Sequence, residues 1–407
     1  MDLQSLIDAV SAVVTSHEGE LVAFRRDLHR NPEPSWQEVR TTRAIMERLE
    51  SAGIPAERLD QTGVVVDLGA TSPTLRVGLR ADIDALPLTE RTGLPFASRR
   101  KGTAHACGHD VHTTALLGAA LALHAHENEL RRLGVAVRLL FQPAEESMPG
   151  GAHIVLEKGL VDDVDIVFAL HCDPRRDLGE IGLRVGPITA AGDQVTVRLT
   201  GHGGHTSRPF LTEDLTFALG KVICDLPGVL SRRLDPRAGA LLVWGGVHAG
   251  GVPNVIPESG EVTGTLRMLD ASAWQGIGPL LHELVEAVVA PYGVEAELRH
   301  VPGVPPVVNT QWGIDALSAV TVALLGNAGA VPTEQSLGGE DFAWLVMNRE
   351  GALGRLGTRT PGGPTYDLHR GDLVIDERAI AIGARTYASL PFAALAARGG
   401  AALPPIV

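Results

Sequence analysis

The chain has 407 residues, of which 44% are hydrophobic and 20% are charged, so it is long enough to bury a large core and to divide into two domains. Its formal net charge of −13 at pH 7 argues against nucleic acid or an anionic membrane as the main partner, because both require a basic face. Chemistry on a small molecule or a peptide is the expectation that remains.

The first residues contain no basic stretch followed by an apolar core, and no window approaches the roughly 18 uninterrupted apolar residues of a spanning helix. The cysteines are Cys107, Cys172 and Cys224, an odd number scattered through a long chain, so a disulfide framework is not expected. These features predict a cytoplasmic protein with no membrane partner.

The predicted elements begin with two helices, because apolar residues recur at helical spacing over 21–28 and again over 42–49. The segment 75–79 then alternates like a strand and leads into Asp82 and Asp84. Two carboxylates are therefore expected at the end of a strand.

A second set of elements repeats this order. The segment 113–124 predicts a buried helix, and 135–141 predicts a buried strand that leads into Glu145–Glu146. A further apolar run, 166–170, precedes His171. Strands that alternate with helices predict an α/β sheet, and ligands of such sheets gather beyond the carboxyl ends of the strands.

A different pattern begins after Gly186–Pro187. Strand, helix, strand, strand, helix and strand are predicted in turn over 195–199, 215–223, 240–244, 261–268, 277–288 and 294–298. This order is typical of a ferredoxin-like α+β layer. We therefore expect an inserted second domain over 188–300, with 1–187 and 301–407 forming a discontinuous first domain.

The run 105–112, His-Ala-Cys-Gly-His-Asp-Val-His, places three imidazoles, a thiol and a carboxylate within eight residues. Thiolate, imidazole and carboxylate ligands together suit zinc or a neighbouring transition metal. The candidate ligands are Cys107, His109, Glu146, His171 and His369. Five ligands exceed one tetrahedral site, and a bridging Cys107 thiolate could let them serve two ions about 3.5 to 4 Å apart.

Each of these residues also has a purely structural interpretation. A single buried histidine is more often hydrogen bonded within the core than bound to a metal, and Cys107 could be a small buried thiol. Glu145–Glu146 could be the solvated start of a helix. For Asp110 the sequence favours capping at a helix start, and for His112 it favours core packing.

Several blocks of the sequence resemble the M20 metallopeptidase family, above all its amidohydrolase branch of hippurate hydrolases, auxin-conjugate hydrolases and N-acyl-amino-acid deacylases. The blocks are 28–33, 78–87, 105–112, 142–146, 201–205, 253–257 and 339–342. The resemblance spans nearly the whole chain in order. It implies an α/β catalytic domain that holds two metal ions, with a mixed sheet flanked by helices, and a satellite domain that forms a homodimer.

The resemblance also implies roles for individual residues. The metal ligands are Cys107 as the bridge, with His109, Glu146, His171 and His369. Glu145 becomes the general base, and Asp84 becomes a carboxylate that orients a ligand or the base. Asp82 stands where the wider family's peptidases carry a ligand histidine, and His109 replaces that ligand in this branch.

Three residues of the expected second domain resemble substrate-contacting residues of the branch. His205 resembles the histidine that reaches across the dimer to polarise the scissile carbonyl, and Asn254 and Arg267 resemble residues that contact the substrate and its carboxylate. The alternatives are a mobile polar loop around His205 and a surface ion pair for Arg267. After His369 the branch has Asn-Pro and an aromatic residue, whereas this chain has Arg370–Leu373.

The expected activity is hydrolysis of the amide bond of an N-acyl-amino acid, which releases a carboxylic acid and the free amino acid. The expected cofactor is a pair of divalent ions, with zinc favoured by the thiolate, although manganese, cobalt or nickel could occupy the site. The alternatives are a dipeptidase or carboxypeptidase with the same metals, and a non-catalytic descendant that binds an acylated ligand or metal. A thiol-redox role for Cys107 is weaker, because no resolving cysteine lies near it in sequence.

Overall fold

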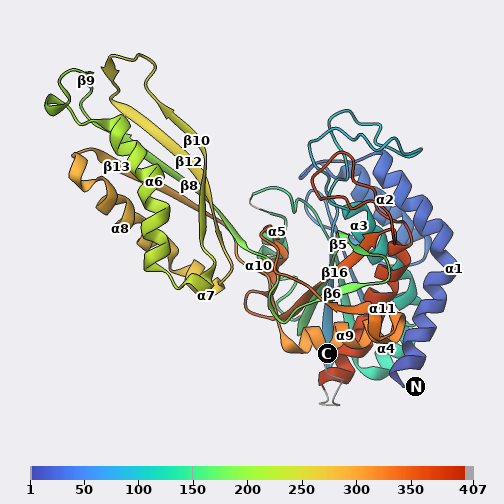
Figure 1. Cartoon of the computed structure of the whole chain (residues 1–407). Helices are drawn as coiled ribbons and strands as arrows, with labels where there is room; N and C mark the ends of the chain where they lie inside the picture. The colour runs from blue at the N-terminus through green and yellow to red at the C-terminus, as the bar shows by residue number, and fades with distance from the viewer. Residues whose placement is uncertain (1, 149, 399–407) are drawn as a thin grey trace. The chain divides into compact units, whose positions relative to one another are not determined.

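The computed structural model of the protein describes residues 2–148 and 150–398. The chain divides into two compact units (Figure 1). The first unit comprises Met1–Ile188, Val307–Glu334 and Trp344–Val407, and the second comprises Thr189–Pro306 and Gln335–Ala343.

The first unit is built around one large mixed sheet. Its strands are β1 (Glu57–Arg58), β2 (Val64–Gly69), β3 (Leu75–Asp82), β4 (Val135–Gln142), β5 (Ile166–Asp177), β6 (Ile181–Leu183), β15 (Ala330–Pro332) and β16 (Glu350–Arg359). They lie in the order β1-β2-β4-β3-β5-β16-β6-β15. The neighbouring pairs β4-β3, β3-β5 and β5-β16 are parallel, so the carboxyl ends of four central strands meet at one edge. A separate ribbon pairs β7 (Gly186–Pro187) with β14 (Val308–Asn309).

The helices associated with this unit are α1 (Leu3–Arg30), α2 (Val39–Ser51), α3 (His109–Ala125), α4 (Glu127–Leu133), α5 (Ala152–Glu157), α9 (Gln311–Leu325), the 3₁₀ turn η4 (Asn327–Gly329), α10 (Phe342–Val346) and α11 (Ala379–Arg398). The bounds of α10 cross the division between the two units at Ala343. The α/β class predicted from the sequence, a mixed sheet flanked by helices, is confirmed.

The central elements are buried on nearly all sides. β4 and β5 are almost continuously buried, as expected of strands in the middle of a sheet covered on both faces. The helix expected over 113–124 begins earlier, at His109, and every residue of α3 from His109 to Leu123 is buried. The metal-candidate run therefore leads directly into the first turn of a core helix.

The last helix, α11, is long and apolar enough to cross a membrane by length and composition alone. However, 72% of its apolar window is buried within the protein, and the helix packs against α1, α3 and α9. Its hydrophobicity is therefore explained by its place in the core of the first unit.

The second unit contains a four-stranded antiparallel sheet in the order β10-β12-β8-β13. Its strands are β8 (Ala191–Thr200), β9 (Gly204–His205), β10 (Leu241–Ala249), β11 (Val255–Ile256), β12 (Ser259–Met268) and β13 (Glu295–Val304). Its helices are α6 (Leu215–Arg233), α7 (Ala271–Gln275) and α8 (Ile277–Val289), with 3₁₀ turns η1 (Pro209–Leu211), η2 (Pro236–Ala238) and η3 (Ala290–Tyr292). The chain order of the four-stranded sheet and its two long helices is β-α-β-β-α-β.

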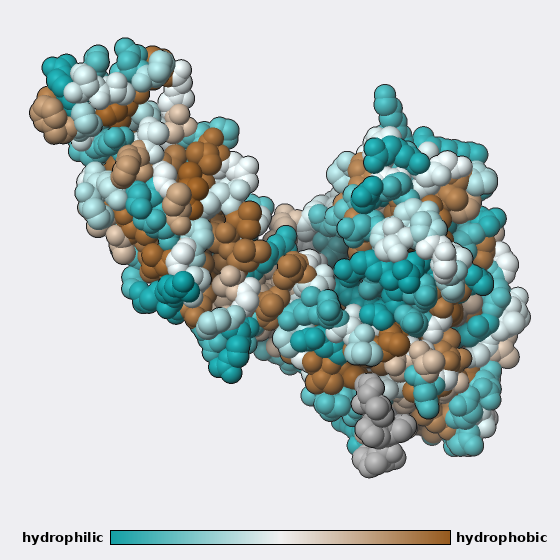
Figure 2. Space-filling model, in the orientation of Figure 1, coloured by the Kyte–Doolittle hydropathy of each residue, from teal (hydrophilic) through white to brown (hydrophobic). Residues whose placement is uncertain are grey.

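A separate apolar core joins this sheet to α6 and α8. The alternation seen in the sequence has its physical basis here, because Val195, Val197 and Leu199 point into that core from β8. The edge strand β10 differs, since its side chains Leu241, Val243 and Val247 are each about half exposed. Figure 2 shows apolar surface on this unit along the side where Figure 1 labels β10.

Candidate metal and active site

The candidate site of the first unit lies where the central strands end. β3 ends at Asp82, just before Asp84, and β4 ends at Gln142, just before the turn that carries Glu145–Glu146. β5 carries His171, and its register with β3 brings that residue to the level of the end of β3. Because these strands are adjacent, their end residues converge on one edge of the sheet.

Five of the sequence-predicted side chains meet at this edge. Potential ligand atoms of Cys107, His109 and His171 all lie within 4.8 Å of one another, and so do those of Cys107, Glu146 and His369. The Sγ atom of Cys107 lies 3.5 Å from Nε2 of His171. Cys107 belongs to both groups, as a residue shared by two neighbouring cation sites would.

His109 supplies the clearest test of whether these residues fit a metal. Its Nδ1 lies 3.1 Å from Oδ1 of Asp84 and 3.0 Å from the Asp84 carbonyl oxygen. Its Nε2 is buried and has no hydrogen-bond partner among the described residues. A carboxylate that holds one ring nitrogen while the other is free is the arrangement of a metal-ligating histidine. The orphaned nitrogen therefore fits a metal ligand.

Electrostatics at the site points the same way. Burial by itself lowers the pKa of His109, but the carboxylates of Asp82, Asp84 and Glu146 outweigh it and raise this pKa to about 10. Burial raises the pKa of the Cys107 thiol, and Glu146, Glu145 and Asp82 raise it further. The site is thus a buried concentration of negative charge, where a bound cation would relieve carboxylate repulsion and favour the thiolate.

His171 is held in the tautomer that a metal requires. Its Nδ1 lies 2.8 Å from the carbonyl oxygen of Cys172, which can only accept a hydrogen bond, so Nδ1 carries the proton. The unprotonated Nε2 then faces Cys107. Burial also lowers the pKa of His171 well below its ordinary value, which keeps the ring neutral.

The turn after β4 holds the two glutamates in fixed positions. Ala144 has a φ of 53°, which is uncommon for a residue other than glycine, and its N–H donates to Glu38 over 2.8 Å. Glu146 N–H donates to Oδ2 of Asp84 over 3.0 Å. Potential ligand atoms of His109, Glu145 and Glu146 lie within 4.8 Å of one another. A carboxylate outside the five-ligand set therefore stands beside the candidate ligands.

Gly151 closes this turn, because its N–H donates to the carbonyl oxygen of Ala144 over 3.1 Å. A Cβ at position 151 would overlap the backbone carbonyl of Pro143. Only glycine lets the two backbone segments approach so closely.

Asp84 connects several parts of the site. It accepts hydrogen bonds from the N–H of Glu146 and from the hydroxyl of Ser35, the latter over 2.7 Å, and it contacts His109. Burial alone would raise the pKa of Asp84, but these hydrogen bonds and the charge of His109 lower it. The carboxylate is therefore ionised and oriented.

The histidine His112 illustrates why proximity alone does not make a ligand. It forms a close group with Asp82 and His109, yet both of its nitrogens are engaged. Nε2 accepts from the N–H of Cys172 over 2.8 Å, so Nδ1 is the donor to Oδ1 of Asp82, over 2.6 Å. As expected from the sequence, His112 is a buried core residue.

The expectation for Asp110 was wrong. Its carboxylate does not cap α3 but contacts Nε of Arg25 over 2.6 Å and Nδ1 of His29 over 2.8 Å. Both partners come from α1, about 80 residues earlier in the chain, so no local pattern could have revealed them.

Sequence reasoning also missed Ser35 and Glu38, which lie in the loop between α1 and α2 and reach the site only through the tertiary fold.

The remaining candidate residues belong to the second unit. His205 on β9 pairs with Val255 on β11, next to Asn254, whose carbonyl accepts from Thr206 N–H. β9 follows shortly after β8, whose last residue, Thr200, pairs with Ser259, the first residue of β12. Arg267 lies eight residues further along β12, which corresponds to about 26 Å. Within this unit, His205 and Asn254 are thus brought together, whereas Arg267 is not near them.

Comparisons with known proteins identify relatives along almost the whole chain. The chain is 37% identical over 372 residues to N-acetylcysteine deacetylase of Bacillus subtilis, covering 91% of this chain and 95% of that protein. It is 45% identical to a protein of Rhodococcus jostii named putative glutamate–cysteine ligase 2-3, covering 92% of this chain but only 46% of that longer protein. The ligase name thus belongs to a protein of about twice this length.

A solved structure and a family description agree with this similarity. The fold resembles that of a Bacillus subtilis protein described as a dinuclear metal-binding peptidase of the M20 family, with a TM-score of 0.80 and 34% identity. The alignment covers 93% of this chain and 98% of that one. Residues 78–392 match the sequence model of the peptidase family M20/M25/M40. The chain therefore belongs to the M20/M25/M40 peptidase family.

Proposed function

We propose that this protein is a metal-dependent amidohydrolase that cleaves the amide bond of N-acyl-amino acids, releasing a carboxylic acid and the free amino acid. The observation that carries the proposal is the buried group of thiol, imidazole and carboxylate ligands beside Glu145, in which Nε2 of His109 has no hydrogen-bond partner among the described residues. Family membership and the similarity to a deacetylase of an N-acetylated amino acid support this substrate class.

The residues that would hold two divalent ions are Cys107, His109, Glu146, His171 and His369, with Cys107 shared. Two such ions, when bound, polarise a carbonyl oxygen and lower the pKa of a coordinated water. We propose zinc as the metal, because a thiolate and three imidazoles favour it, with manganese, cobalt or nickel as alternatives. The fit of the donor set is the support for this assignment.

Glu145 is the proposed general base. Its carboxylate takes a proton from the attacking water and later delivers that proton to the leaving nitrogen, so that the amine departs neutral. Asp84 keeps His109 in the ligating tautomer and holds the N–H of Glu146, which fixes both the ligand and the turn that carries the base.

In the second unit, we assign His205 to polarise the scissile carbonyl and Asn254 and Arg267 to contact the substrate. His205, on β9, lies near the Ser259 end of β12, and Arg267 lies near the other end of β12, too far apart to contact one small substrate from the same unit. This separation supports a homodimer in which each subunit completes the site of the other. The exposed apolar side chains of the edge strand β10 provide a surface suited to such an interface.

We also place the protein in the cytoplasm, with a small-molecule substrate and no nucleic-acid or membrane partner. All three cysteines are free thiols, and Cys107 and Cys172 are buried. This cysteine usage supports a reducing compartment. The net charge of −13 supports the exclusion of nucleic acid and anionic lipid.

The experiment that tests the proposal measures amino-acid release from N-acetyl, N-benzoyl and indole-acetyl amino acids and from dipeptides, with metal-loaded protein. Glu145→Gln should lower kcat by about 100-fold to 10,000-fold, the usual contribution of a general base, with the metal content unchanged. Glu157→Gln, an exposed position on α5, is the matched control and should retain full activity.

The panel also separates the alternatives. Preference for free dipeptides over acyl-amino acids would identify a dipeptidase or carboxypeptidase that uses the same residues. A wild-type protein that holds two metals but is inert on the whole panel would support a non-catalytic binding protein. Full activity of Glu145→Gln would show that the base lies elsewhere.

A further inference from the structure

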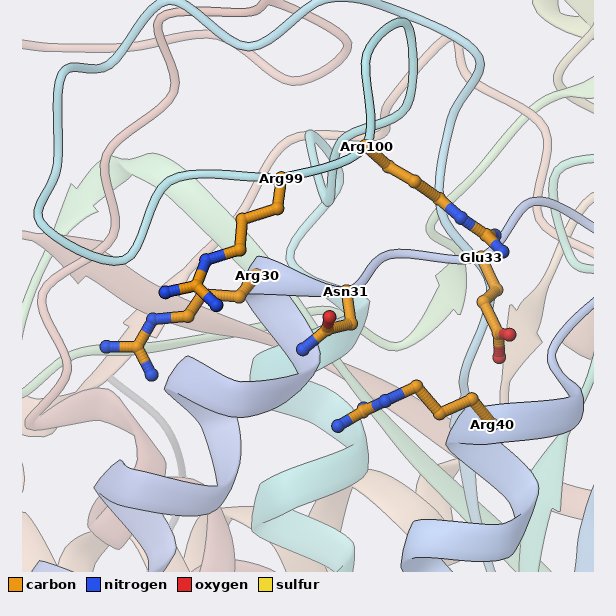
Figure 3. A pocket seen from close by; sticks show the side chains of 6 residues that line it. All are labelled: Arg30, Asn31, Glu33, Arg40, Arg99 and Arg100. Carbon is orange, nitrogen blue, oxygen red and sulfur yellow. The ribbon is translucent and has the colours of Figure 1, made fainter.

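A small basic cavity lies in the first unit, apart from the metal candidates. Its volume is about 140 Å³, and it is lined by the end of α1, the start of α2 and the loop that follows Ser98. The lining residues, shown in Figure 3, are Arg30, Asn31, Glu33, Arg40, Arg99 and Arg100. Four guanidinium groups and one carboxylate in so small a space are unexpected in a chain with a net charge of −13.

Most of this positive charge is not neutralised by the protein. Within residues 2–148 and 150–398, Arg30, Arg99 and Arg100 form no ion pair with a carboxylate. Arg40 directs Nη2 to both carboxylate oxygens of Asp27, at 2.9 and 2.7 Å. Its Nη1 is buried and has no hydrogen-bond partner among the described residues. The cavity therefore keeps unpaired guanidinium donors.

The single carboxylate of the cavity is already engaged. Oε2 of Glu33 accepts the N–H of Thr41 in the first turn of α2, over 2.9 Å. Glu33 is 5% exposed, so this carboxylate is a buried partner for the amino end of α2 rather than a mobile counter-ion. Its charge offsets one guanidinium at most.

Two ordinary explanations account for only part of the cluster. Arg30 is the last residue of α1, where a cation interacts favourably with the helix dipole, and Arg99 and Arg100 are exposed and hydrated. However, the backbone N–H of Arg99 donates to the carbonyl of Arg30 over 2.9 Å, which fixes two like-charged residues side by side. In Figure 3 their side chains extend in the same direction. Such a pairing places two positive charges side by side, an arrangement that a bound anion would stabilise.

The loop that carries Arg100 is also held toward the cavity. Nη1 of Arg100 donates to the carbonyl oxygen of Pro32 over 3.2 Å, across the cavity wall. Arg100 therefore spans from its own loop to the segment after α1, and Figure 3 shows its side chain reaching toward Glu33. The remaining donors of this guanidinium are left for a ligand.

We propose that this cavity is a binding site for a phosphate group, either free phosphate or the phosphate of a small phosphorylated molecule. A phosphate carries up to two negative charges and several acceptor oxygens, so it can accept hydrogen bonds from the neighbouring guanidinium groups of Arg30 and Arg99 at once. The volume equals that of about four to five water molecules in the liquid, enough for one tetrahedral oxyanion, so the organic part of a phosphorylated molecule would lie outside the cavity.

Phosphate bound here would also brace the loop between α1 and α2. The carbonyl of Glu33 accepts the N–H of Ala85, next to Asp84, over 2.8 Å. The same loop carries Ser35, which donates to Asp84. Bound phosphate should therefore raise the melting temperature of the protein, because it stabilises a segment that contacts the core of the first unit.

The test is isothermal titration calorimetry of the metal-loaded protein with inorganic phosphate, and separately with glycerol phosphate, at fixed ionic strength. We compare wild type with the double variant Arg30→Gln/Arg99→Gln. The control is Arg43→Gln/Arg232→Gln, which removes the same number of positive charges at exposed positions outside the cavity. Circular dichroism checks that each variant is folded.

The proposal expects one saturable phosphate site whose affinity falls by about tenfold or more in the cavity variant, equivalent to about 1.4 kcal/mol, and is unchanged in the control. Tighter binding of glycerol phosphate would identify a phosphorylated molecule as the ligand source, and tighter binding of inorganic phosphate would identify the free ion. Equal affinity in all three proteins would overturn the proposal, because binding at the metal centre or nonspecific charge attraction would then explain it.

Discussion

Glu38 offers a sharp test of how the fold holds the turn that bears Glu145. Its side chain is completely buried, one oxygen accepts the hydroxyl of Thr62, and the other accepts the N–H of Ala144, both over 2.8 Å. Burial, reinforced by the nearby carboxylate of Asp84, raises the pKa of Glu38 from 4.5 to about 7. The folded protein therefore favours the neutral acid.

The sign and size of the effect on stability follow from this shift. Between pH 4.5 and about 7 the unfolded chain has lost the Glu38 proton while the folded protein retains it. The contribution to stability is fully present below pH 4.5 and is lost as pH rises through about 7. A difference of about 2.5 between the folded and unfolded pKa values, at about 1.4 kcal/mol for each unit, corresponds to a contribution of about 3.5 kcal/mol.

The perturbation is Glu38→Gln, which keeps the size of the side chain and one acceptor oxygen but cannot ionise. We expect the free energy of unfolding of the wild type to fall between pH 5 and pH 8 by about 2.5 kcal/mol more than that of the variant. Urea unfolding followed by tryptophan fluorescence measures both values, and Glu157→Gln should show the wild-type pH dependence.

Because the other titrating groups are the same in both proteins, their contributions to the pH dependence of the free energy of unfolding cancel in this comparison. If wild type and Glu38→Gln lose the same free energy within about 0.5 kcal/mol, Glu38 is ionised in the folded protein. The argument from burial and from the Asp84 carboxylate would then be wrong, and the hydrogen bonds from Thr62 and Ala144 would dominate instead.

Three further predictions concern the supports of the site. Asp84→Asn should weaken metal affinity by about 10-fold to 100-fold, because His109 loses its carboxylate partner. Competition with a chelator measures the metal affinity, and an unchanged affinity would contradict the role assigned to Asp84. Gly151→Ala should lower kcat by about 100-fold, because it displaces the turn that carries Glu145. Gly220→Ala, at a position with open space around it, should leave kcat unchanged, and equal rates in both variants would refute the argument from the close approach of Gly151 to Pro143. Asp110→Asn should destabilise the protein by about 3 kcal/mol in urea unfolding, because buried Arg25 loses the closer of its two carboxylate partners and keeps Glu377 at 3.4 Å, and a loss below about 1 kcal/mol would show that the pair is not needed.

The sequence alone was sufficient where the information is local. The alternation of Val195, Val197 and Leu199 predicts a strand with one buried face because side chains of a strand alternate regardless of what lies opposite. The density of imidazole, thiol and carboxylate over 105–112 predicts cation chemistry because those atoms are uncommon in such numbers. The α/β class follows from the order of such elements.

The tertiary structure decided which distant side chains meet. The fold brings Cys107, in the segment just before α3, and His171 on β5, 64 residues apart, to a separation of 3.5 Å between Sγ and Nε2. The same fold places Glu38 against Ala144, 106 residues later, and pairs Asp110 with α1 instead of with its own helix start. A buried charge takes whichever partner the packing supplies, because leaving it unpaired is costly, and that choice depends on contacts between segments that no local pattern encodes.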